Sequence, residues 1–169
     1  VILCVFTAVG IISTQLTAFH YNLDSGRQFN IFAVLAETLG IFLLFVICNW
    51  AVSTLADGKG KFAEIIIFTS YALIPLIITE VMLLVSSNVF SLKERAFYGI
   101  IRSVGLIWTA VHIFVSNKEV HEYSGGKALL VLFGSVFGMY LLILIITVAY
   151  SMFAQLLSFI SMVISEIRA

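Results

Sequence analysis

The chain has 169 residues, of which 62% are hydrophobic and 11% are charged, and its formal net charge is zero. Soluble domains contain about 45–50% apolar and about 25% charged residues, so this composition excludes a soluble globular protein and predicts an integral membrane protein. The balanced charge, without a long Lys/Arg run, also excludes a nucleic-acid-binding surface.

Five apolar runs, in chain order, are each long enough to cross a bilayer, which takes about 20 residues. They cover residues 1–19, 31–56, 63–90, 97–116 and 128–150. The connections between them are short and polar, so none can hold a soluble domain. We therefore predict a single all-α membrane domain over 1–169, a bundle of five transmembrane helices with antiparallel sequence neighbours. Because the chain begins inside the first run, we expect a processed or longer N-terminal segment.

The fifth run continues into a mostly apolar tail. As one helix, residues 128–167 would be about 60 Å long at about 1.5 Å per residue, which is about twice the thickness of the hydrocarbon layer. We therefore expect a break near Tyr150–Ser151. The tail, 151–168, carries a stripe of polar residues at helical spacing, which predicts a C-terminal amphipathic helix at the membrane interface or packed against the bundle.

Three ionisable residues, Glu37, Glu80 and Arg102, lie inside apolar runs and are expected in the same leaflet. Charged groups at membrane depth are costly and are often functional. This candidate intramembrane polar cluster has two interpretations. It could form the polar pathway of a transporter or channel component. Alternatively, Arg102 pairs with an acid, Glu80 in the simplest case, to fix helix register, while Glu37 reaches toward the interface.

Two features concern helix packing. Pro75 lies within the third run, where its missing N–H group predicts a kink. Gly134 and Gly138, four residues apart in the fifth run, form a face that allows close approach of another helix. That helix could belong to the same bundle or to a second copy in a homo-oligomer, and we favour the bundle.

The loops at 57–62 and 117–127 each combine glycines with lysines. Neither fits the G-x-x-x-x-G-K-[ST] pattern of a nucleotide-binding loop, and no spacing of Cys, His or Asp predicts a metal site or catalytic motif. We therefore expect no catalytic residues, no cofactor and no metal. A small surface with both signs of charge suits a protein partner or lipid headgroups. Its candidate partner-facing residues are Asp57, Lys59, Lys61, His121, Glu122 and Lys127.

Several short motifs follow one another along the chain: Trp50, "DGKGKF" at 57–62, "SYALIP" at 70–75, Trp108 and "HEYSGGKAL" at 121–129. In this order they resemble the bacterial branch of the Yip domain family, which is named for its Ypt/Rab-interacting members. The resemblance implies five membrane helices, no known catalytic residues and cytosolic loops at 57–62 and 117–127. It also implies a small GTPase as partner, and a plasma membrane if the protein is bacterial or an endoplasmic reticulum or Golgi membrane if it is eukaryotic.

The leading hypothesis from the sequence is a non-enzymatic membrane scaffold or adaptor that docks a partner through its short cytosolic loops. The alternative is a transporter or channel component that uses the intramembrane polar cluster. A third hypothesis assigns membrane shaping to the tail. Membrane lipids and a protein are the expected partners, nucleic acid is not, and homo-oligomerisation is left open.

Overall fold

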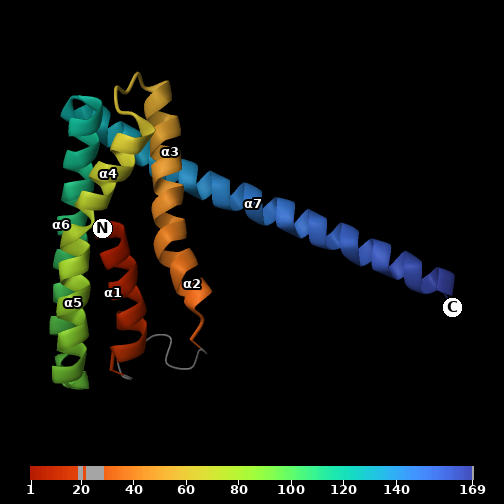
Figure 1. Ribbon diagram of the computed structural model, residues 1–169, viewed down its shortest axis with the longest axis horizontal. Coiled ribbons are helices and arrows are strands. Elements are labelled where there is room, and N and C mark those ends of the chain that lie inside the picture. Colours follow the sequence, from red (N-terminus) through yellow and green to blue (C-terminus); the bar gives the residue numbers. More distant parts are fainter. Residues whose placement is uncertain (19–20, 22–28, 169) are drawn as a thin grey trace.

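A computed structural model of the protein describes residues 1–18, 21 and 29–168, and every element in them is helical (Figure 1). The elements follow in the order α1 (Ile2–Leu16), α2 (Ile31–Leu35), the π-helical turn η1 (Ala36–Gly40), α3 (Ile41–Leu55), α4 (Phe62–Ala72), α5 (Ile74–Val89), the 3₁₀ turn η2 (Leu92–Glu94), α6 (Arg95–His121) and α7 (Gly125–Arg168).

Four helical segments of the described chain are long and apolar enough to cross a membrane: Ile31–Leu55, Phe62–Val89, Leu92–His121 and Gly125–Ile164. The first of these joins α2, η1 and α3. Helix α1 has 15 residues, about 22 Å at about 1.5 Å per residue, which is shorter than the hydrocarbon layer of about 30 Å. The protein is thus an all-helical membrane protein, but the predicted count of five spanning helices is not confirmed.

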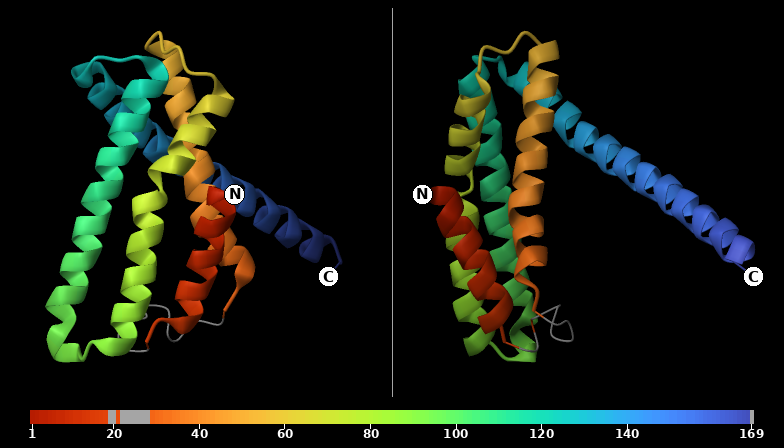
Figure 2. Two further views of the ribbon diagram at one scale, coloured as in Figure 1. Left: turned by 60° about the vertical axis from the view of Figure 1, so that its left-hand side comes forward. Right: turned by 45° about the vertical axis from the view of Figure 1, so that its right-hand side comes forward.

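The segment Phe62–Val89 is interrupted at Leu73. Helix α4 ends at Ala72 and α5 begins at Ile74, and Figure 2 shows the two meeting at an angle. Pro75 lies in the first turn of α5, where its missing N–H group needs no partner within the helix. The proline therefore stands where the span changes direction.

Helix α5 packs against α6, and α7 packs against α3. Gly134 and Gly138 lie in the second of these contacts: a Cβ atom on Gly134 would be 3.1 Å from Val52 Cγ1, and one on Gly138 would be 3.7 Å from Cys48 Cβ. The glycine face is therefore turned toward α3 of the same chain. A homo-oligomer remains a prediction.

Helix α7 runs without interruption from Gly125 to Arg168, so the expected break near Tyr150–Ser151 is wrong. The sequence after Gly138 contains neither Gly nor Pro, the residues that most often end or kink a helix. Its hydroxyl groups also fit into the helix: Thr147 Oγ1 donates to the carbonyl of Ile143 at 2.8 Å. Nothing in the local sequence therefore ends α7.

The distal part of α7 projects away from the bundle (Figures 1 and 2). All side chains from residue 143 to residue 164 are exposed, so, of the two arrangements expected for the tail, packing against the bundle is wrong. The amphipathic helix at the interface remains a prediction, and it would be the continuation of α7 rather than a separate element.

Candidate functional site: two interlocked loops

Two loops that are distant in the sequence meet at one end of the bundle, where α3 connects to α4 and α6 connects to α7 (Figure 1). We call residues 57–61 and 121–124 the paired-loop platform. Each part begins its turn with a non-glycine residue in the left-handed backbone region, Asp57 at φ 52° and Glu122 at φ 54°. Glu122 directly follows α6, which is a common way to end a helix.

Glycines let the two loops interlock. The N–H group of Gly60 donates a hydrogen bond to His121 Nδ1 at 3.2 Å. A Cβ atom on Gly58 would lie 2.5 Å from Tyr123 Oη and 2.6 Å from His121 Nδ1, and one on Gly60 would lie 2.3 Å from Val120 Cγ1. Side chains do not fit at these distances, so the close approach of the loops requires glycine at both positions.

Tyr123 is the buried centre of the platform. Its hydroxyl group donates to the carbonyl of Ser53 at 3.2 Å, and its ring stacks on His121 at 5.1 Å between centroids. Burial raises the pKa of the Tyr123 phenol, and the Asp57 carboxylate raises it further, so the phenol keeps the proton that it donates. The ammonium group of Lys127 lies 4.9 Å from the ring centroid, in the range of a cation–π contact.

The outer surface of the platform is charged. Lys59 of the first loop forms an ion pair with Glu122 of the second. Both side chains are well exposed, so the pair contributes about 0–1 kcal/mol to stability. Asp57, Lys61 and Lys127 are also exposed. The partner-facing residues predicted from the sequence thus lie together, except that His121 is buried.

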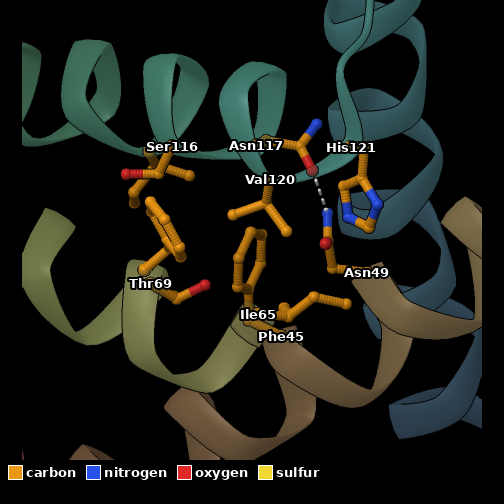
Figure 3. A pocket seen from close by; sticks show the side chains of 10 residues that line it. Phe45, Asn49, Ile65, Thr69, Ser116, Asn117, Val120 and His121 are labelled. Carbon is orange, nitrogen blue, oxygen red and sulfur yellow. Dashed lines mark hydrogen bonds between the residues drawn. The ribbon is translucent and has the colours of Figure 1, made fainter. Parts of the chain in front are cut away.

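Beneath the platform lies a buried amide network that joins three helices. Asn49 Nδ2 of α3 donates to Asn117 Oδ1 of α6 at 3.0 Å (Figure 3) and to Ser135 Oγ of α7 at 3.2 Å. Asn117 Nδ2 in turn donates to the carbonyl of Ala128 at 3.3 Å. Asn49, Asn117 and Ser135 are almost completely buried, so each bond satisfies polar groups that are shielded from bulk solvent.

Asn117 is not among the residues that the sequence singles out, because the sequence predicts a loop over residues 117–127. Helix α6 instead continues to His121, so part of that expectation is wrong. Asn117 and His121 are four residues apart and share one helix face. Both are buried there by α3, α4 and α7. The spacing of these two polar residues is the feature of the sequence that indicates a longer helix.

A cavity of about 10 Å³ lies beside the network (Figure 3). Its polar lining comes from Asn49, Thr69, Ser116, Asn117 and His121. The volume is about that of one water-sized probe, so the space suits a single water molecule and no larger ligand.

The residues of the predicted intramembrane polar cluster are divided between two places. Glu80 of α5 and Arg102 of α6 are close enough for their charges to interact, and Tyr98 shares their surroundings. Within the described part of the chain, however, no salt bridge within 4.0 Å joins Glu80 to Arg102. Glu37 lies in η1 and lines a separate cavity of about 830 Å³.

That large cavity is lined mostly by apolar side chains, and its lining residues come for the larger part from α3, α6 and α7 and for the rest from α1, η1, α4 and α5. Glu37 lines it, whereas Glu80 and Arg102 do not. The cavity therefore does not connect the three residues of the predicted polar cluster.

A charge exchange tests the relation between Glu80 and Arg102. Glu80→Arg and Arg102→Glu alone should each lower the free energy of unfolding in detergent by about 1 kcal/mol, because each places like charges side by side. The double variant, Glu80→Arg with Arg102→Glu, should recover most of that loss in a thermal unfolding assay. A double variant no more stable than either single variant would show that the two side chains do not support each other.

Comparison with known proteins gives one match. A family model described as the Yip1 domain matches residues 1–147, a range that includes both loops of the platform and all of the buried amide network. No match was found among curated proteins or among solved structures. The match therefore places the chain in a family but adds no individual relative.

Proposed function

Because this chain belongs to the Yip1 domain family, we propose that it is a non-enzymatic membrane scaffold that docks a protein partner through the paired-loop platform. The observation that carries the proposal is the interlocking of two loops about 60 residues apart into one surface, through Gly58, Gly60, His121 and Tyr123. A surface that is already ordered loses little conformational entropy on binding.

The charges of the platform favour a protein over an anionic membrane surface. Lipid headgroups attract clusters of about four to eight Lys/Arg residues, whereas here two acids lie among three lysines, on the platform and at the start of α7: Asp57, Lys59, Lys61, Glu122 and Lys127. Charges of both signs at the rim of an interface select a partner with the complementary pattern. The family resemblance suggests a small GTPase, at a bacterial plasma membrane or at an endoplasmic reticulum or Golgi membrane.

The transporter hypothesis has less support. A polar pathway would need Glu37, Glu80 and Arg102 around one water-accessible space, but only Glu37 lines the large cavity, whose remaining surface is almost wholly apolar. Scaffolding requires no such space.

Site-specific photocrosslinking in native membranes tests the docking surface. A photoreactive amino acid at Lys61 should capture a discrete partner, whereas the same probe at Lys93, in η2 at the opposite end of the bundle, should not. Adding Gly58→Ala should reduce the adduct several-fold, because the new Cβ would lie 2.5 Å from Tyr123 Oη and push the loops apart.

Gly126→Ala is the matched control, since a Cβ at Gly126 meets no atom within 4 Å, and it should leave the adduct unchanged. Equal capture from Lys61 and Lys93 would contradict docking at the platform. An adduct that persists in Gly58→Ala would show that the loops need not be interlocked for binding.

A further inference from the structure

An ionisable residue, His121, lies between the two paired loops. His121 ends α6 and is 2% exposed. Its Nδ1 accepts the Gly60 N–H group at 3.2 Å, its ring stacks on Tyr123, and both glycines of the first loop approach its ring closely enough to exclude a Cβ atom. The imidazole is therefore a direct contact that holds the first loop against the end of α6.

The hydrogen bond from the Gly60 N–H group determines the tautomer of the His121 imidazole. An imidazole nitrogen that accepts an N–H donor carries no proton, so neutral His121 holds its single proton on Nε2. That atom is buried and has no hydrogen-bond partner among the described residues. Figure 3 shows the ring beside Asn49, at the edge of the small cavity that it lines. A water molecule in that cavity would give Nε2–H an acceptor.

We propose that His121 is a proton-sensitive clasp, which holds the two loops together when neutral and releases the first loop when protonated. Protonation turns Nδ1 into a donor, so it would then face the Gly60 N–H group donor to donor and the bond would be lost. The imidazolium would also be a charge buried without a partner. Because histidine titrates between about pH 5 and pH 8, the loops should separate as the pH falls through this range.

The surroundings of the ring offer no ready partner for the imidazolium. The titratable and charged groups nearest to it on the elements that pack around it are Glu64 of α4, Asp57, Lys59 and Lys61 of the first loop, Lys118 and Glu119 of α6, which pair with each other, Glu122 and Tyr123 of the second loop, and Lys127 of α7.

Of these groups, Glu64 is the one whose charge acts on the imidazole, and its carboxylate already accepts the N–H group of Lys61 at 2.9 Å. The Glu122 carboxylate is paired with Lys59. Among the described contacts, no carboxylate bonds to His121. The protonated ring would therefore gain most by moving toward solvent, which opens the platform.

The test is the hydrogen exchange of the Gly60 amide between pH 8 and pH 5, in the detergent-solubilised full chain and corrected for the intrinsic pH dependence of exchange. In the unmodified protein, protection should fall about tenfold below about pH 6, the effect expected for losing one hydrogen bond. His121→Gln keeps an acceptor for the Gly60 N–H group but does not titrate, so its protection should not change with pH. His112→Gln is the matched control: His112 is exposed on the same helix and bonded to Trp108, and its replacement should leave the pH response intact.

Constant protection in the unmodified protein, or an equal loss in His121→Gln, would overturn the proposal. Should His121→Gln fail to fold, ¹⁵N-histidine spectra of the unmodified chain decide instead, since a neutral ring protonated on Nδ1 contradicts the clasp. The inference adds regulation to the proposed docking site. Its readout is the contact between the loops and not partner capture, so its failure leaves the docking proposal standing.

Discussion

Gly105→Ala should destabilise the protein, whereas Gly99→Ala on the same helix should stabilise it. A Cβ atom on Gly105 would lie 2.1 Å from Thr79 Oγ1 and 2.6 Å from Thr79 Cβ, while one on Gly99 would meet no atom within 4 Å. Both glycines are in α6, so the two substitutions share the same chemistry and the same gain in helix propensity. They differ only in the space that the new methyl group finds.

Thr79 cannot move aside to relieve the clash. It is buried, and its hydroxyl donates to the carbonyl of Pro75 at 2.7 Å in the first turn of α5. The helices must separate instead, and overpacking of this kind costs about 1–3 kcal/mol. Gly99→Ala should gain about 0.5–1 kcal/mol, because alanine is the better helix former.

Thermal unfolding in detergent, followed by tryptophan fluorescence, measures both changes. The unfolding temperature should fall for Gly105→Ala and rise slightly for Gly99→Ala. Similar shifts in the two variants would mean that α5 and α6 do not pack closely at Thr79.

The sequence was most informative about helical segments whose length is set by the thickness of a bilayer. The second and third apolar runs, expected at 31–56 and 63–90, correspond to the helical segments Ile31–Leu55 and Phe62–Val89 to within one residue at each end. Run length is a strong signal because a polar backbone must stay in a helix throughout the hydrocarbon layer. The match to the Yip1 domain confirms the family that the motifs indicated.

Prediction was weaker where contacts distant in the sequence decide the structure. The end of α6 is mostly polar from Asn117 onward, and Asn117 is buried there with its amide bonded to α3 and α7, contacts that the local sequence does not reveal. Likewise, the glycines at 58 and 60 resemble ordinary turn residues until His121 and Tyr123 are seen against them. For α7 the prediction failed in the opposite way. The thickness of a bilayer predicts a break in this helix, but the local sequence continues it to Arg168.

Asn49→Ala should cost the protein about 1–3 kcal/mol, because it leaves the buried Asn117 Oδ1 and Ser135 Oγ without their donor. Within the described part of the chain, Asn49 bonds to both of the other two, so its replacement removes the hydrogen bonds that α3 makes to α6 and to α7. Gln155→Ala is a suitable control: that amide lies exposed on the projecting part of α7, and among the described residues it bonds only to Ser151, at 3.4 Å. Its replacement should change stability by less than about 0.5 kcal/mol.

A double-mutant cycle separates the network from simple loss of packing. If the Asn49–Asn117 bond is favourable, Asn49→Ala with Asn117→Ala should destabilise by less than the sum of the two single variants, with a coupling of about 1 kcal/mol in thermal unfolding. Strict additivity would mean that each amide acts alone. Because Asn117 also binds the carbonyl of Ala128 at the start of α7, losing the network should loosen the second loop of the platform. The adduct formed from Lys61 should then decrease in Asn49→Ala and stay unchanged in Gln155→Ala.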